Sequence, residues 1–165
     1  MGNNAGIFSM SDETFDGGCD CRAVRYRLHA RPMFVHCCHC RWCQRETGTA
    51  FALNALIEAD RLQLLAGPVD VVDTPSHSGN GQRIARCPTC RVAVFSHYSS
   101  PLVSFVRVGT LDEPDRFPPD IHIFTTSKQP WVTLSGDVPV VPEYYRSAQM
   151  WPAESLARRK ALFPK

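Results

Sequence analysis

Apolar and polar residues alternate over several short stretches of the chain. In residues 23–29 (AVRYRLH), Val24, Tyr26 and Leu28 alternate with polar or charged neighbours, which is the two-residue period of a half-buried strand. Runs rich in valine, isoleucine, leucine and phenylalanine predict further short strands at 51–60, twice within 62–73 around Gly67-Pro68, and at 82–87, 91–97, 102–109 and 121–124. Because turn residues separate these runs, the pattern predicts a mainly β fold.

Helical signals are few. Residues 41–47 (RWCQRET), which end at Gly48, predict one or two turns of helix. The tail 152–163 (PAESLARRKALF) places a proline at a first-turn position and good helix formers behind it, so we expect a short helix near 152–162. Strands and helices do not alternate in the way that builds a parallel nucleotide-binding sheet.

Composition narrows the class of protein. The 165 residues suit one domain, and 44% hydrophobic with 21% charged residues is ordinary for a soluble globular protein. A net charge of +2 is too small to indicate a nucleic-acid or membrane surface. Residues 1–14 are small and polar and lack the features of a signal peptide, so we predict a disordered leader there and a cytoplasmic location.

The eight cysteines fall into three groups, at 19 and 21, at 37–43, and at 87 and 90. In a reducing compartment, cysteines spaced in this way favour metal binding over disulfides. Cys87 and Cys90 form a C-x-x-C on a tight turn, which supplies half of a tetrahedral site. Cys19 and Cys21 point the same way in an extended segment and can supply the other half, which predicts a closed, structural zinc site. The alternative is a disulfide or unbound thiols.

The central group favours a second ion. Cys38, Cys40 and Cys43 can converge if a helix begins after Cys40, and three thiolates leave a tetrahedral zinc ion with an open position. Such an all-sulfur ion suits a further thiol, which would lose its proton on binding. This predicts a catalytic zinc site that handles thiols.

Other assignments of the central group stay open. His36 or His39 could fill the fourth position and make this site structural as well. Cys40 and Cys43 also form a dithiol motif, although the usual βαβ surroundings are missing. Cys37 points away from Cys38 in an extended chain and is expected to be a buried free thiol.

The three blocks together resemble the glutathione-dependent formaldehyde-activating enzyme family, whose domain is shared with centromere protein V. The resemblance covers about 15–131 and rests on GGCDCRAVRY, CHCRWCQRETGTAF, RCPTCRVAVF, VGTLDEP and HIFTTSKQPW. Residues 132–165 carry no motif of the family, and we expect them to pack on the same domain as a C-terminal extension. Arg22 and Arg91 stand where the family usually has glycine, which leaves the geometry of both turns open.

This resemblance implies a zinc-held β sandwich of short sheets with two zinc ions. The structural ion would bind Cys19, Cys21, Cys87 and Cys90, and the catalytic ion Cys38, Cys40 and Cys43. The family's activity joins glutathione to formaldehyde as S-hydroxymethylglutathione, formally a carbon–sulfur lyase run in reverse. The expected partners are therefore a small-molecule thiol, with glutathione as cosubstrate, and a small aldehyde, with no nucleic acid or membrane. The alternative is a non-catalytic, zinc-held binding module.

Three cations near these motifs are candidate ligands of the carboxylates of glutathione. Arg41, Arg45 and Lys128 could bind them, and an arginine could do so bidentately, although each could equally be a solvated side chain. Trp42 is expected in the core or in a pocket wall. His122 alternates with isoleucines on a strand and is expected to be structural, or else to face the zinc cavity.

Overall fold

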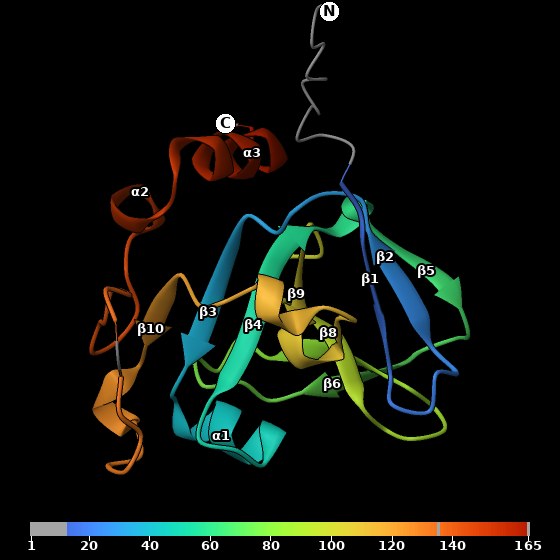
Figure 1. The fold of residues 1–165 in the computed structure, drawn as a ribbon, viewed down its shortest axis with the longest axis horizontal. Helices are drawn as coiled ribbons and strands as arrows, with labels where there is room; N and C mark the ends of the chain where they lie inside the picture. Colours follow the sequence, from blue (N-terminus) through green and yellow to red (C-terminus); the bar gives the residue numbers. More distant parts are fainter. Residues whose placement is uncertain (1–12, 135, 165) are drawn as a thin grey trace, which may run out of the picture.

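The computed structural model describes residues 13–134 and 136–164, so most of the predicted leader, residues 1–12, lies outside the described residues. Two sheets make up the fold (Figure 1). The smaller has the strand order β1-β2-β5 and is antiparallel throughout. Its strands are β1 (Phe15–Gly18), β2 (Arg25–Leu28) and β5 (Leu62–Ala66).

The larger sheet has the strand order β10-β3-β4-β9-β8-β7-β6. Its neighbours are antiparallel except for β10, which runs parallel to β3. The strands are β3 (Phe34–Cys38), β4 (Ala52–Glu58), β6 (Asp70–Thr74), β7 (Gln82–Arg86), β8 (Ala93–Tyr98), β9 (Val103–Arg107) and β10 (Ile121–Ile123). The predicted mainly β fold with few short helices is confirmed.

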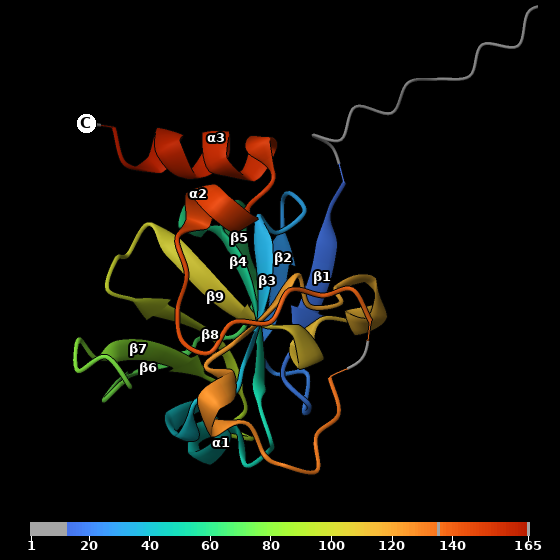
Figure 2. The same ribbon diagram turned by 90° about the vertical axis from the view of Figure 1, so that its left-hand side faces the viewer.

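Within residues 13–134 and 136–164, three α-helices accompany the sheets: α1 (Arg41–Thr47), α2 (Ser147–Met150) and α3 (Ala153–Leu162). Single 3₁₀ turns are η1 (Ala59–Arg61), η2 (Val108–Thr110), η3 (Pro114–Arg116) and η4 (Thr125–Ser127). Helix α1 ends at Gly48, whose φ of 67° is a left-handed conformation that glycine adopts without strain. Both views place α1 at one end of the molecule and α3 at the other (Figures 1 and 2).

The main core lies between the two sheets. The apolar face of β2, formed by Val24, Tyr26 and Leu28 in and before the strand, packs with residues of the larger sheet such as Ile57 and Val106. All five of these residues are fully buried. This is the alternation seen in the sequence, with one face of β2 turned to the core.

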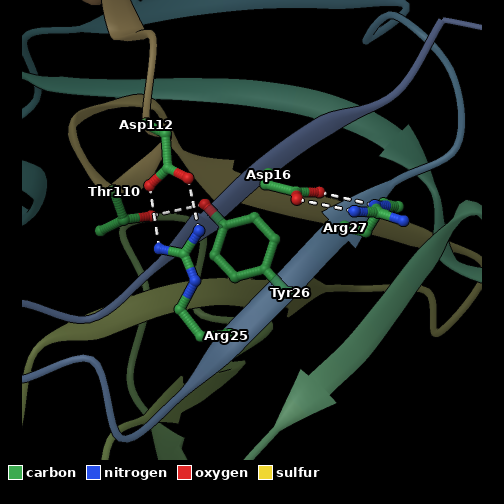
Figure 3. A network of polar contacts seen from close by, with 6 residues as sticks. All are labelled: Asp16, Arg25, Tyr26, Arg27, Thr110 and Asp112. Carbon is green, nitrogen blue, oxygen red and sulfur yellow. Dashed lines mark hydrogen bonds and ion pairs between the residues drawn. The ribbon is translucent and has the colours of Figure 1, made fainter.

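Polar contacts fasten the small sheet to the segment after β9 (Figure 3). The Tyr26 hydroxyl lies 2.7 Å from the Thr110 hydroxyl, and the Arg25 guanidinium makes a two-pronged contact with the Asp112 carboxylate. Arg27 binds Asp16 of β1 in the same bidentate way, at 2.7 and 2.8 Å. These hydrogen bonds lower the pKa of both carboxyl groups.

A second apolar cluster covers the opposite face of the larger sheet. It joins Phe34 and Leu56 of the sheet to Trp151 and Leu156 of the C-terminal segment. Strand β3 is therefore buried on both faces. The Arg158 side chain of α3 donates to the Glu58 carboxylate at the end of β4, at 2.7 Å, which ties the C-terminal helix to this sheet.

Candidate metal centres

Four cysteines from two turns lie together. Cys19 and Cys21 follow β1, Cys87 and Cys90 connect β7 to β8, and the four sulfurs lie within 4.8 Å of one another. The Cys21 sulfur is 3.5 Å from that of Cys19 and 3.7 Å from that of Cys87. Sulfurs held about 2.3 Å from a tetrahedral zinc ion lie about 3.8 Å apart. The donor set and its spacing therefore fit a closed zinc site.

Backbone amides surround this four-cysteine cluster. The Val24 amide donates to the Cys19 sulfur at 3.3 Å, and the amides of Thr89 and Cys90 donate to the Cys87 sulfur at 3.4 and 3.5 Å. Amide donors stabilise a thiolate. The two amide bonds to Cys87, that from Cys90 foremost, lower the pKa of Cys87 to about 6, which suits a metal ligand.

Both turns of the cluster contain an arginine in a left-handed conformation. The φ of Arg22 is 63° and that of Arg91 is 64°. The amide of Arg22 donates to the Cys19 carbonyl at 3.1 Å, and that of Arg91 to the Cys87 carbonyl at 3.0 Å. The two arginines thus adopt the backbone that glycine favours, and the turns form despite the departures from the family pattern.

Three further cysteines lie at the corner between β3 and α1. Cys38 ends the strand, Cys40 caps the helix, and Cys43 lies in its first turn, with the three sulfurs within 4.8 Å of one another. The Cys43 amide donates to the Cys40 sulfur at 3.3 Å. Hydrogen bonds from the thiols of Cys38 and Cys43 lower the pKa of Cys40. The residues therefore suit a soft cation, and three sulfurs leave a fourth position for another donor.

The neighbouring histidines lie apart from this three-cysteine cluster. His39 points to the other side of the chain, where its Nε2 lies 3.0 Å from Nδ1 of His122 and 3.5 Å from the sulfur of Cys37. His36 Nε2 lies 2.6 Å from the Tyr145 hydroxyl. Burial lowers the pKa of both His36 and His39 to about 4, so both are neutral at physiological pH. Neither one forms a hydrogen bond with the three thiols.

Cys37, His39 and His122 form a separate group within 4.8 Å of one another. The Cys37 side chain is buried, with 2% of its surface exposed, in line with the expectation of a buried thiol. Burial raises its pKa to about 12, so this thiol is protonated at neutral pH.

A cavity of about 720 Å³ lies beside the three-cysteine cluster, along the face of the larger sheet. Cys38, Cys40 and Cys43 line it at the α1 end, together with Trp42. Side chains of the C-terminal segment line it as well, including those of α3. The four-cysteine cluster has no side chain in this cavity.

The cations predicted for glutathione lie outside this cavity. Arg41 is exposed and donates to the Gln44 side chain at 2.6 Å, and Arg45 is exposed on the same helix. The Lys128 ammonium donates to the carbonyls of Gln129 and Val132. Their contact with glutathione stays a prediction.

The cavity is lined instead by Arg107, Arg146 and Arg159, which the sequence analysis missed. Arg107 lies at the end of a predicted strand, and the other two belong to a segment without a motif. The sequence carried no signal that would have placed them here.

Comparison with known proteins identifies the family of this chain. The sequence model described as "Glutathione-dependent formaldehyde-activating enzyme" matches residues 14–127, which is more than half of the chain. The chain belongs to this family. The match ends before the C-terminal segment that lines the cavity, so that segment is a feature of this chain beyond the matched region.

Curated proteins and solved structures give no further information about the function of the chain. No curated protein matched the chain. One solved structure, a crystal structure of a Rhodobacter sphaeroides protein, is 20% identical with a TM-score of 0.44, over 59% of this chain and 87% of that one. Among the described residues, no helix has the length and apolar character needed to cross a membrane.

Proposed function

We propose that this protein is a zinc-dependent carbon–sulfur lyase that joins a glutathione-type thiol to a small aldehyde, as in the formation of S-hydroxymethylglutathione. The observation that carries the proposal is the position of Cys38, Cys40 and Cys43, whose sulfurs converge at the wall of a large cavity. Cys19, Cys21, Cys87 and Cys90 would hold a second, structural zinc ion away from that cavity.

The cysteines of the cavity would act as the ligands of the catalytic ion. When bound there, zinc supplies a soft Lewis acid that lowers the pKa of an incoming thiol toward neutrality. In the forward direction, the thiol sulfur bonds to the carbonyl carbon, the carbon–oxygen π bond breaks, and the oxygen takes a proton. The reverse reaction releases the thiol and the aldehyde.

Arg107 is suited to an anionic thiol such as glutathione. It lines the cavity on β9, and its Nε is buried and has no hydrogen-bond partner among the described residues. Burial lowers its pKa, while the charges of Cys43 and Glu46 act in the opposite direction. A carboxylate in the cavity would stabilise this buried guanidinium.

A cytoplasmic location belongs to this proposal. All eight cysteines are free of disulfides. Free thiols and metal sites of this kind suit a reducing compartment, which also holds glutathione.

Cobalt substitution tests the proposed site. Cobalt bound to thiolates absorbs in the visible and near-ultraviolet range, so a change of ligand is visible directly. We expect glutathione to shift the sulfur-to-metal absorption of the wild type and to leave the spectrum of Cys43→Ser unaltered. If no small thiol shifts the wild-type spectrum, the lyase proposal is wrong and the zinc-held binding module replaces it.

A further inference from the structure

The C-terminal segment gives the cavity an aromatic wall. Tyr144, Tyr145, Trp151 and Phe163 line the cavity, and Phe124 of the η4 turn joins them. All but Phe124 lie beyond residues 14–127, so this wall is built by the part of the chain that the family match leaves out. A one-carbon aldehyde is too small to pack against these aromatic rings.

Hydrogen bonds and stacking hold the inner part of this wall in place. The Tyr145 hydroxyl lies 2.6 Å from His36 Nε2 and accepts a hydrogen bond from the Trp151 indole at 2.6 Å. The Trp151 ring stacks on Phe34, with 5.2 Å between ring centroids and 18° between planes. The wall is therefore preorganised, which reduces the entropy that a ligand must lose on binding.

The outer part of the wall presents aromatic surface to solvent. Tyr144 has 58% of its surface exposed and Phe163 has 42%. The Tyr144 ring stacks on Tyr145 at 5.1 Å and lies 6.1 Å from the ring of Phe124. Phe124 has a φ of 55°, which is rare for a bulky residue, and such strain is typical of functional sites. Exposed aromatic rings beside a reactive site are suited to stacking on a flat ligand.

Apart from the cysteine thiols, the charged side chains that line the cavity are all basic. No aspartate or glutamate among the described residues lines it, whereas three arginines do. The Arg159 guanidinium lies between two rings, 6.0 Å from Trp151 and 5.8 Å from Phe163, and no ion pair is recorded for it within 13–134 and 136–164. The unpaired guanidinium can bind a carboxylate bidentately.

A chain of contacting rings joins Tyr144 to this arginine. Tyr144 stacks on Tyr145, whose hydroxyl accepts a hydrogen bond from the Trp151 indole, and the Arg159 guanidinium lies 6.0 Å from the Trp151 ring. Cys38, Cys40 and Cys43 line the same cavity as Tyr144 and Arg159. A ligand stacked on Tyr144 would thus lie in the cavity that holds both the thiols and this cation. The cavity volume of about 720 Å³ leaves room for such a ligand beside a thiol.

We propose that the electrophile of this protein is an aromatic aldehyde that carries a carboxylate, with its ring on Tyr144 and its carboxylate on Arg159. This inference rests on the proposed lyase function and names its second substrate. The thiol S–H adds across the aldehyde C=O: the carbon–sulfur bond forms, the π bond breaks, and the oxygen takes the proton. No oxidant or reductant is needed.

Binding is tested first with an unreactive analogue, 4-(hydroxymethyl)benzoate, by titration calorimetry on the zinc-loaded protein. Stacking and a charged hydrogen bond each contribute on the order of 1–2 kcal/mol. We therefore expect Tyr144→Ala and Arg159→Gln each to weaken binding about tenfold. Trp131→Ala and Lys160→Gln are the matched controls, because both residues are exposed and neither lines the cavity. The ligand assignment is overturned if the controls weaken binding as much, or if the wild type does not bind the analogue.

Kinetics then compares aldehydes by the rate of loss of free thiol above the uncatalysed rate, with glutathione as the thiol. We expect kcat/KM for 4-formylbenzoate to exceed that for formaldehyde at least about tenfold. Arg159→Gln should reduce the rate with 4-formylbenzoate and leave that with benzaldehyde unchanged. A preference for formaldehyde overturns the inference and leaves the lyase function standing.

Two further outcomes separate the assignment of the aldehyde from the proposed lyase function. If Arg159→Gln slows the reaction of every aldehyde equally, Arg159 binds the carboxylate of glutathione, and the assignment to the aldehyde is wrong. If the analogue binds through Tyr144 and Arg159 but no aldehyde consumes thiol, the ligand class is supported and the lyase function fails.

Discussion

The two cysteine clusters differ in how the chain assembles them. The four-cysteine cluster joins segments 66 residues apart, through the contact of Cys21 with Cys87. The three-cysteine cluster forms within the single segment from Cys38 to Cys43. An ion in the first cluster closes a long loop, whereas an ion in the second spans only one corner of the chain. Under the proposed function, a metal in the first cluster would hold the fold together, and a metal in the second would serve the chemistry.

The surroundings of the two cysteine clusters also differ. In the four-cysteine cluster every tetrahedral position has a sulfur, and none of these side chains reaches the cavity. In the three-cysteine cluster a position is left over, all three side chains line the cavity, and His36 and His39 bond elsewhere. The two clusters therefore differ in the number of sulfurs and in access to the cavity, which are the features that distinguish structural from catalytic zinc sites in general.

The largest expected effect is the loss of the fold in Cys87→Ser. Structural zinc contributes about 10–16 kcal/mol in zinc-finger peptides, which is comparable to the whole stability of a domain, about 5–15 kcal/mol. We expect this variant to be insoluble or unfolded by circular dichroism. Cys43→Ser should keep a cooperative thermal transition, with Tm lowered by about 5 °C or less.

Chelator treatment of the wild type is the control for the Cys87→Ser and Cys43→Ser variants. Removal of both ions should reproduce the damage of Cys87→Ser rather than that of Cys43→Ser. Equal loss of stability in the two variants would show that the distinction between structural and catalytic zinc is wrong.

The metal content gives a smaller but more direct difference. Elemental analysis of protein purified without chelator should find about two zinc ions per chain in the wild type and about one in Cys43→Ser. Cys37→Ser is the matched control, because Cys37 is a neighbouring thiol outside both clusters, and it should keep two. One ion in the wild type would mean that the three-cysteine cluster does not hold zinc stably.

Much of the fold could be predicted because most strands are short runs rich in β-branched and other apolar residues between turn residues, and some also alternate between a polar and an apolar face. Strand β2, with Tyr26 and Leu28 turned to the core, is an example. Strand β3 was missed, since burial on both faces removes the alternation. Strand β1 was missed as well, because two of its four residues are glycine, which is a poor strand former.

Part of the candidate site could likewise be predicted from the sequence, and part could not. The grouping of the sulfurs follows from short spacings, such as the two residues between Cys87 and Cys90, which restrict where the ligands can point. The aromatic wall depends on contacts across about a hundred residues, such as that between His36 and Tyr145, and no local pattern predicts them. Arg159 looked like any polar residue of an exposed helix. Its place beside the cavity follows only from the packing of Trp151 on Phe34.

The smallest expected effect concerns a turn of the four-cysteine cluster. Arg22 has a φ of 63°, a conformation that costs a residue with a side chain about 1 kcal/mol more than glycine. Glycine also loses more conformational freedom on folding, so we expect Arg22→Gly to stabilise the protein by about 0.5 kcal/mol and to raise Tm by about 1–2 °C. Arg22→Ala removes the same charge but keeps the strain, so it should leave Tm unchanged. Equal shifts in the two variants would trace the effect to the lost charge, and the turn would then not be strained. A gain confined to glycine would show that this turn keeps its shape at a cost, as expected where a metal cluster fixes the backbone.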